Sequence, residues 1–342
     1  MKKLFINLIL LFLLICSFGK AIDNYDYLSK TSHTVNIYLN DSKYTPEYFE
    51  NIYNAEDKEI YSYVPWRQID KRLILSEDLN RNVEANIFYL YGDSSFLLEG
   101  TTLFKDDING CLIDEDTAYK LFGDIDVKDR KITVDNRVVT VRGINNKYKN
   151  TIFLQDISNS KEPMEVLSLE IPSEEGVFNS KDFVNTFIMK YGLDNCTVDS
   201  NIYSTISGAF IMIFFFIIVI YILCYTIKKL IKNKCKPVLK VIYMAEGAIL
   251  ILITKIFFKI KFTALINIIP SKWSDFQQWG EIYKENIENF KYFIYAKKYS
   301  IDIPRISSTV YVIIYIALSI ILFIIGVAIL RKSTKKEFFE VK

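Results

Sequence analysis

Histidine, cysteine and glycine are scarce in this 342-residue chain, which has one histidine, five cysteines and twelve glycines. No two cysteines form a C-x-x-C pair, so we expect no zinc site or other His/Cys metal site. No G-x-x-x-x-G-K-[ST] sequence occurs, so the chain has no P-loop for binding nucleotide phosphates. His33, in a Ser-His-Thr stretch, is predicted to be a surface residue. We therefore expect a non-catalytic chain without a cofactor, whose ATP hydrolysis, if any, takes place on a partner.

Basic residues are depleted in the middle of the chain. Residues 21–205 contain 32 acidic and 19 basic residues, a balance of −13, so the flanking regions must carry +15 to give the total of +2. An acidic middle and basic flanks indicate two different compartments. The basic residues gather at the ends of apolar runs rather than in an accessible patch, so nucleic-acid binding is not predicted.

Charge is absent altogether from two long runs. Ile206 to Ile227 comprises 22 uncharged residues and Val310 to Leu330 comprises 21, and each can cross a hydrocarbon core of about 30 Å as a helix. A third apolar run, Leu4 to Phe18, has 15 residues and follows Met1-Lys2-Lys3. That run fits either a first transmembrane helix or a signal peptide cleaved after Gly19.

A fourth candidate span, Val238 to Phe258, contains three charged residues. The positive-inside rule supports it, because lysines and arginines crowd the exits of both long runs and place both exits in the cytoplasm. If both long runs end in the cytoplasm, the chain must cross the membrane once more between them to return to the outside. The two basic clusters are Lys228, Lys229, Lys232, Lys234, Lys236 and Lys240, and Arg331, Lys332, Lys335 and Lys336.

The predicted fold class is an α-helical membrane protein with four transmembrane helices and an extracytoplasmic α+β domain between helices 1 and 2. A signal peptide is the alternative for the first helix. Trp273 and Trp279 lie in the outer loop and are expected to anchor it at the outer membrane interface. The protein is expected in the cell membrane, as a multi-pass protein with its large domain outside. The boundaries are 1–20 (first helix or signal peptide), 21–205 (outer domain), 206–227 (second helix), 228–237 (cytoplasmic segment), 238–258 (third helix), 259–308 (outer loop), 309–330 (fourth helix) and 331–342 (tail).

The segment of the outer domain with the clearest predicted secondary structure is CLIDEDTAYKLFG, residues 111–123. A short strand is predicted to end at Asp114, whose carboxylate is a good N-cap for a helix from Glu115 to Phe122. Gly123 follows where a left-handed C-cap residue is favoured. The acidic residues of this stretch lack the spacing of an EF-hand loop, so a calcium site is not predicted.

Other elements follow from alternation of apolar residues. A hairpin from Arg130 to Ile144, turning at Asp135-Asn136, would place Ile132 opposite Val139 and pack its apolar face on Leu121 and Phe122. We also predict strands from Glu84 to Gly92 and from Glu165 to Ile171, a helix from Ser180 to Tyr191, and a strand or helix near Leu73. Cys111 and Cys196 either form a disulfide or remain apart, with Cys111 a buried strand residue.

Residues 97–144 resemble the extracytoplasmic core domain of MacB-like and FtsX-like ABC permeases. In that family a strand, a helix ending in a Leu-Phe-Gly type sequence and a hairpin ending in Thr-Val-x-Gly follow in this order. Leu121-Phe122-Gly123 and Thr140-Val141-Arg142-Gly143 match it. The family's layout is also one helix, a large outside domain and three helices. The core-domain motif comprises Asp114, Leu121, Phe122, Gly123, Thr140, Val141 and Gly143.

The resemblance implies a permease subunit whose energy comes from a separate ABC ATPase, and a homodimer or a heterodimer with a related permease. KCKPVLKVIYMAEGAIL, residues 234–250, is similar to the family's cytoplasmic coupling segment, with Glu246 in the place of its acidic residue. The cluster from Lys228 to Lys240 would dock the ATPase, or only fix orientation and bind anionic lipid. The alternative function is a membrane-anchored binding or sensory protein without an ATPase. The family often begins with an amphipathic cytoplasmic helix before the first span, whereas the given sequence reaches its first apolar run at Leu4.

Overall fold

The computed structural model describes residues 2–30, 34–55, 61–76, 78–98, 102–171, 176–194, 196–199, 202–232, 276–295 and 297–340, and the single positions 241, 245 and 247. The chain divides into two compact units. One comprises Met1–Lys30, Ile202–Glu288 and Arg305–Lys342, and contains the apolar helices. The other comprises Thr31–Asn201 and Asn289–Pro304, and we call it the outer domain. It includes residues 289–304, which the sequence analysis assigned to the outer loop.

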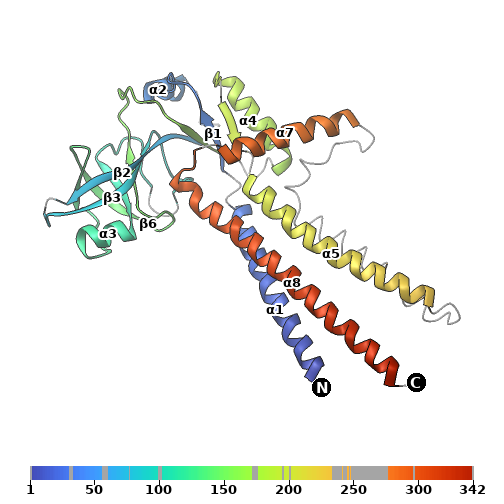
Figure 1. Ribbon diagram of the computed structural model, residues 1–342. Coiled ribbons are helices and arrows are strands. Elements are labelled where there is room, and N and C mark those ends of the chain that lie inside the picture. Colours follow the sequence, from blue (N-terminus) through green and yellow to red (C-terminus); the bar gives the residue numbers. More distant parts are fainter. Residues whose placement is uncertain are drawn as a thin grey trace. The chain divides into compact units, whose positions relative to one another are not determined.

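Three helices dominate the first unit: α1 (Lys2–Lys30), α5 (Ile202–Lys232) and α8 (Ile303–Glu340), which Figure 1 shows as the long coiled ribbons. In the described part of the chain these three are long and apolar enough to cross a membrane, over Phe5–Lys30, Ile202–Lys228 and Ser300–Ile329. The sequence predicts a fourth, Val238 to Phe258, and all of that segment except positions 241, 245 and 247 lies outside the described residues. The structure therefore supports a membrane protein with three described spans.

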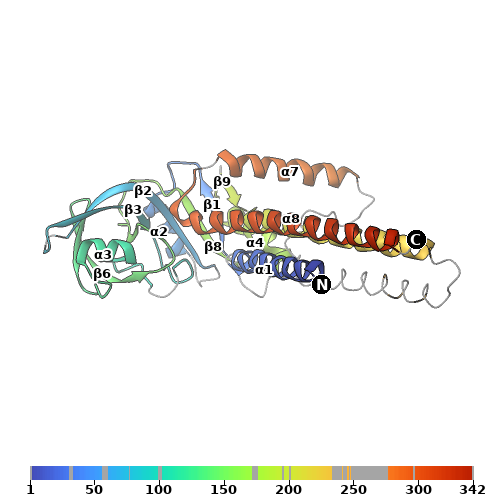
Figure 2. The same cartoon turned by 60° about the horizontal axis from the view of Figure 1, so that its bottom comes forward.

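The three helices pack against one another along one seam, and they run side by side in Figures 1 and 2. Phe18 of α1 lies 5.3 Å from Phe214 of α5, measured between ring centroids. The Ser17 hydroxyl donates to the Tyr315 carbonyl of α8 over 2.9 Å, and the Ser319 hydroxyl donates to Ser17 Oγ over 3.1 Å. Such small polar residues hold helices together in an apolar surrounding. The buried core of the seam comprises Ala21, Tyr25, Ile211, Phe214, Val312 and Ile316.

Within the described residues, the outer domain is built on one nine-stranded sheet with the order β3-β7-β4-β6-β5-β2-β8-β1-β9. The strands are β1 (Thr34–Leu39), β2 (Tyr63–Ser76), β3 (Arg81–Leu90), β4 (Gly110–Asp114), β5 (Lys131–Val134), β6 (Arg137–Asn145), β7 (Thr151–Gln155), β8 (Val166–Glu170) and β9 (Cys196–Asp199). The helices are α2 (Pro46–Ala55), α3 (Glu115–Phe122) and α4 (Gly176–Lys190), and α7 (Phe276–Tyr295) divides between the two units.

The sheet closes on itself because β2 also pairs with β3. Strand β2 is 14 residues long, and an irregularity between Ile69 and Arg72 lets its two halves serve different neighbours. Its first half pairs with β8 and its second half with β5. The ring β3-β7-β4-β6-β5-β2 surrounds one apolar core, and β8, β1 and β9 extend from it to meet α2 and α4 around a second core.

The predicted strand–helix module is confirmed. Helix α3 covers Glu115 to Phe122, and the Asp114 carboxylate accepts hydrogen bonds from the backbone N–H groups of Asp116 and Thr117. The same carboxylate also accepts the Thr151 N–H over 2.9 Å and so fixes the start of β7. Gly123 has φ +75° and ends the helix in the left-handed conformation, which favours glycine.

The predicted hairpin is confirmed in its register. Val134 lies opposite Arg137 and Ile132 opposite Val139, and Asp135 and Asn136 both have positive φ, as a tight two-residue turn requires. The fully buried side chain of Leu121 and the partly buried one of Phe122 pack against the hairpin's apolar face. Thr140 and Val141 continue β6, and the register between β4 and β6 then skips Arg142, because Gly143 lies opposite Leu112.

Arg142, the variable residue of the Thr-Val-x-Gly sequence, is therefore a bulge residue. Its guanidinium makes two hydrogen bonds of 2.8 and 3.1 Å to the Asp107 carboxylate. This pair was not predicted from the sequence, because Asp107 lies 35 residues away from Arg142.

The predicted strand from Glu84 begins at Arg81, and the one from Glu165 covers Val166–Glu170. The predicted helix from Ser180 begins earlier, at Gly176. The ambiguous segment near Leu73 is strand β2, and β1, α2, β7 and β9 were not predicted.

Cys111 is a free, fully buried thiol on β4. Of the two alternatives for Cys111 and Cys196, the disulfide is therefore wrong. Cys196 lies on β9, and five strands separate β9 from β4 in the sheet order. A disulfide needs Cα atoms within about 7 Å, whereas neighbouring strands alone are about 4.8 Å apart.

We expect Cys111 to resist alkylation by N-ethylmaleimide until the protein unfolds, because burial removes access and raises the pKa of the thiol above its usual value. If exposure requires an opening of about 3 kcal/mol, labelling is slowed about 100-fold relative to the chain in urea. Mass spectrometry of the Cys111 peptide, with and without urea, measures this ratio. Rapid labelling of the folded chain, or a peptide linking Cys111 to Cys196, would contradict it.

Candidate functional site

The outer domain joins the apolar helices through strands that pair with each other. The chain enters from α1 into β1 and leaves from β9 into α5. Strands β1 and β9 are antiparallel, with Asn36 opposite Asp199 and Leu39 opposite Cys196. The two attachment points therefore lie at the same end of one ladder. Backbone hydrogen bonds hold the two strands together directly beside these attachment points.

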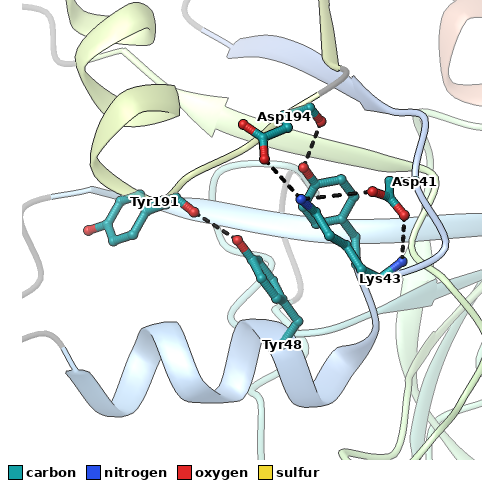
Figure 3. A network of polar contacts seen from close by, with 6 residues as sticks. Asp41, Lys43, Tyr48, Tyr191 and Asp194 are labelled. Atoms are coloured by element: carbon teal, nitrogen blue, oxygen red, sulfur yellow. Dashed lines mark hydrogen bonds and ion pairs between the residues drawn. The ribbon is translucent and has the colours of Figure 1, made fainter.

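A polar network fixes the segment that leads into β9 (Figure 3). Lys43 Nζ lies 3.1 Å from Asp194 Oδ2 and 3.8 Å from Asp41 Oδ2. The Tyr44 hydroxyl donates to the Asp194 carbonyl and the Tyr48 hydroxyl to the Tyr191 carbonyl, each over 2.7 Å. These contacts join the start of α2 to the turn after α4.

The contribution of each of these contacts to stability depends on how deeply it is buried. Lys43 is exposed, so its ion pairs are worth little, although the hydrogen bond to Asp194 raises the pKa of its ammonium group. Tyr44 is fully buried, and desolvation raises the pKa of its hydroxyl, which stays a donor at neutral pH. The Tyr44 hydrogen bond is therefore the one that positions the turn before β9.

The third attachment is residues 297–302, which we call the strap; it binds the outer domain directly before α8 begins. The Ser300 N–H donates to Gln68 Oε1 of β2 over 2.8 Å. The Asn86 side-chain amide of β3 donates to Ser300 Oγ over 2.6 Å. Lys297 Nζ lies 3.0 Å from both carboxylate oxygens of Glu165. Both ends of the strap are thus bound to the sheet.

Aromatic packing seats the middle of the strap. The Tyr299 ring meets Trp66 edge to face at 4.9 Å between centroids and stacks with Tyr38 at 6.2 Å. Tyr299, Ser300, Ile301 and Asp302 are all buried. Asp302 closes the turn η3 (Ser300–Asp302), since its carboxylate accepts the Tyr299 N–H over 3.2 Å. The strap is therefore part of the outer domain's core, and α8 follows it at Ile303.

Buried hydrogen bonds link the strap's support to the β1–β9 ladder. The Trp66 indole N–H donates to Ser168 Oγ over 2.8 Å, and the Ser168 hydroxyl donates to Asn36 Oδ1 over 2.8 Å. All three side chains are buried. Asn36 is the β1 residue opposite Asp199, so one continuous chain of contacts connects the three attachments within the outer domain.

We expect the double variant Gln68→Ala, Ser300→Ala to release the strap. Removing two hydrogen bonds, one of which satisfies a buried N–H, costs about 2 kcal/mol, so opening of the strap becomes about 30-fold more frequent. The readout is trypsin cleavage after Lys297 and Lys298 in the full chain in detergent, with cleavage after Lys161 as the internal standard. Ser160→Ala, in an exposed loop, is the matched control. Equal cleavage of the strap in variant and wild type would show that these bonds do not hold it.

The predicted ATPase-coupling residues fall at and beyond the end of α5. Lys228 is exposed on α5, and Lys229 and Lys232 belong to its last turns. Lys234, Lys236, Lys240 and Glu246 lie outside the described residues, so their roles stay predictions. Of the predicted interface anchors, Trp279 is half-buried on α7, and Trp273 lies outside the described residues, as does His33.

The core-domain motif residues hold the fold of the outer domain rather than a reactive site. Asp114, Leu121, Val141 and their neighbours are buried or cap an element. Within the described residues, no cluster of three or more histidine, cysteine, aspartate or glutamate side chains could hold a metal ion. Gln68, Asn86 and the strap were not predicted from the sequence, because their hydrogen bonds span more than 200 residues.

No family model matches the chain, and no curated protein matches its sequence. Among solved structures, the periplasmic region of MacB from Actinobacillus actinomycetemcomitans is similar with a TM-score of 0.39 and 13% identity, over 49% of this chain and 89% of that one. The extracellular domain of the noncanonic ABC-type transporter YknZ from Gram-positive bacteria is similar with a TM-score of 0.35 and 11% identity, over 48% and 98%. At these identities and TM-scores the likenesses do not show a family.

Proposed function

We propose that this chain is the permease subunit of an ABC transporter of the MacB/FtsX type, in which a separate ATPase moves the outer domain for export or mechanotransmission. The observation that carries the proposal is the set of three ordered attachments. The outer domain follows α1, precedes α5 and holds the strap before α8. The resemblance of residues 97–144 to the core domain of such permeases adds to it.

The proposed mechanism is movement of helices rather than a pore. Each of the three described spans is a continuous helix, so a displacement at its cytoplasmic end would reach its outer end. In the outer domain the attachments are connected by the β1–β9 ladder and by the Trp66–Ser168–Asn36 hydrogen bonds. The domain would then respond to the helices as one body.

Retention of the first helix is part of the proposal. Ser17 and Phe18 contact α8 and α5, and Ala21 and Tyr25 continue the same seam. Cleavage after Gly19 would remove Ser17 and Phe18 and cut the seam in two. These contacts favour residues 1–20 as the beginning of a transmembrane helix over a signal peptide.

The proposed partners follow from the resemblance of the sequence to ABC permeases. The lysines from Lys228 to Lys240, with Glu246, would contact the ATPase in the cytoplasm, where they are also close to anionic lipid headgroups. A second permease copy or a relative would complete the complex. These assignments rest on the sequence resemblance.

The test is purification of the tagged full-length chain from its native membranes in mild detergent, followed by mass spectrometry of the proteins that accompany it. We expect a P-loop ATPase near stoichiometric amounts, and its loss when Lys232, Lys234 and Lys236 are changed to glutamate. Lys335→Glu with Lys336→Glu is the charge-matched control at the other cytoplasmic exit. Protease protection of the outer domain checks that orientation is kept.

An ATPase that remains bound to the triple variant would remove the docking assignment. The absence of any ATPase, under conditions that preserve other membrane complexes, would overturn the permease proposal. The chain would then be an anchored binding or sensory protein.

A further inference from the structure

Helix α7 has an apolar face that runs along its whole length. Phe276, Tyr283 and Ile294 are separated by seven and eleven residues, which are close to two and three turns at about 3.6 residues per turn, so they share one side of the helix. Gln277, Glu281 and Lys284 lie on the other side. This is the pattern of an amphipathic helix.

Three side chains of this apolar face are exposed. Phe276 is 84% exposed, Tyr283 69% and Ile294 54%. The polar side chains Gln277, Glu281 and Lys284 are exposed as well. A helix with exposed side chains on both its apolar and its polar side is stabilised at a boundary between an apolar and an aqueous phase. There the apolar side contacts the apolar phase and the polar side contacts water.

The chain itself brings α7 to such a boundary. Only residues 296–302 separate Tyr295, the last residue of α7, from Ile303, where α8 begins. Seven linking residues keep Tyr295 within about 29 Å of Ile303 even when fully extended. Trp279 and Tyr283 combine an apolar ring with a polar group, as side chains at the headgroup level do.

We propose that α7 lies in the plane of the outer leaflet, with the face of Phe276, Tyr283 and Ile294 in the acyl boundary and the face of Gln277, Glu281 and Lys284 in water. The partner is thus a lipid surface. The helix would hold the outer end of the last span at a fixed depth. This inference does not depend on an ATPase partner, so it stands or fails separately from the proposed function.

The test uses the full chain in nanodiscs of phosphatidylcholine that contain a phosphatidylcholine analogue with a photoactivatable diazirine near the glycerol backbone. After irradiation, mass spectrometry locates the lipid adducts. We expect adducts at Phe276, Tyr283 or Ile294 and none at Gln277, Glu281 or Lys284. Carboxylates react readily with diazirine products, so an unlabelled Glu281 is informative.

A pair of neighbouring variants sharpens the result. Tyr283→Glu places a charge on the apolar face and should reduce the adducts on α7 several-fold, while Lys284→Glu, one residue away on the polar face, should leave them unchanged. Adducts spread over both faces would overturn the proposal. So would an absence of adducts together with cross-linking of α7 to a second copy, which would make the face a protein contact.

Discussion

Replacing Trp66 by alanine is expected to lower the free energy of unfolding of the outer domain by about 4 kcal/mol. Trp66 is fully buried, between Phe88 at 5.4 Å and Tyr299 at 4.9 Å, measured between ring centroids. Its removal leaves a cavity under the strap and takes the indole N–H away from Ser168. Both the core and the support of the strap are lost.

Pulse proteolysis of the full chain in urea measures this effect without using tryptophan fluorescence. Trp66→Phe is the control that separates the two contributions, because it keeps most of the ring and loses the hydrogen bond, at a cost of about 1.5 kcal/mol. Trypsin cleavage after Lys298 should rise more in the alanine variant than in the phenylalanine variant. A loss below about 1 kcal/mol in Trp66→Ala would contradict the packing described here.

Asp114→Ala should destabilise the outer domain by about 3 kcal/mol, which combines the loss of an N-cap with an unsatisfied buried N–H. The Asp114 carboxylate accepts the N–H groups of Asp116, Thr117 and Thr151, and the Thr117 hydroxyl as well. The side chain is buried, so water cannot replace these bonds. One residue therefore fixes both the start of α3 and the start of β7.

The same urea experiment tests it, with Asp116→Ala as the matched control. Asp116 is an exposed carboxylate in the same helical turn, and its loss should cost only a few tenths of a kcal/mol through the helix dipole. Asp114→Asn should fall between the two, since asparagine caps helices but carries no charge. Equal stability of Asp114→Ala and Asp116→Ala would refute the double role of Asp114.

The elements that the sequence predicts well are those determined by neighbouring residues. Asp114 and Gly123 bracket α3 because capping depends on the adjacent turn. Asp135-Asn136 sets the hairpin register because a two-residue turn leaves no other pairing. In contrast, β1 and α2 lie in a stretch where tyrosine, asparagine and charged residues are mixed without a clear period, and tertiary packing decides their structure.

The contacts of the strap could not be predicted from local sequence patterns for the same reason. Ser300 meets Gln68 across 232 residues and Asn86 across 214, and none of the three stands in a recognisable motif. The extension of α1 beyond Phe18 was not predicted because Lys20, Asp23 and Asp26 interrupt the apolar run. Ala21 and Tyr25 nevertheless continue the buried seam. The hydrogen bonds of the strap and the continuation of α1 are both evident only from the packing of segments that are far apart in the sequence.

Under the proposed function, the β1–β9 ladder would determine how the outer domain bears force. Both strands join their helices at the same end, where Asn36 faces Asp199, and the described register comprises four residue pairs. Drawing the two attachment points apart would break the hydrogen bonds one after another from that end, as a zipper opens. Moving the two points together along the strands would leave the β1–β9 bonds unloaded and would shear β1 against β8, whose five residue pairs share the load. The domain would transmit a joint displacement of α1 and α5 and yield when they separate.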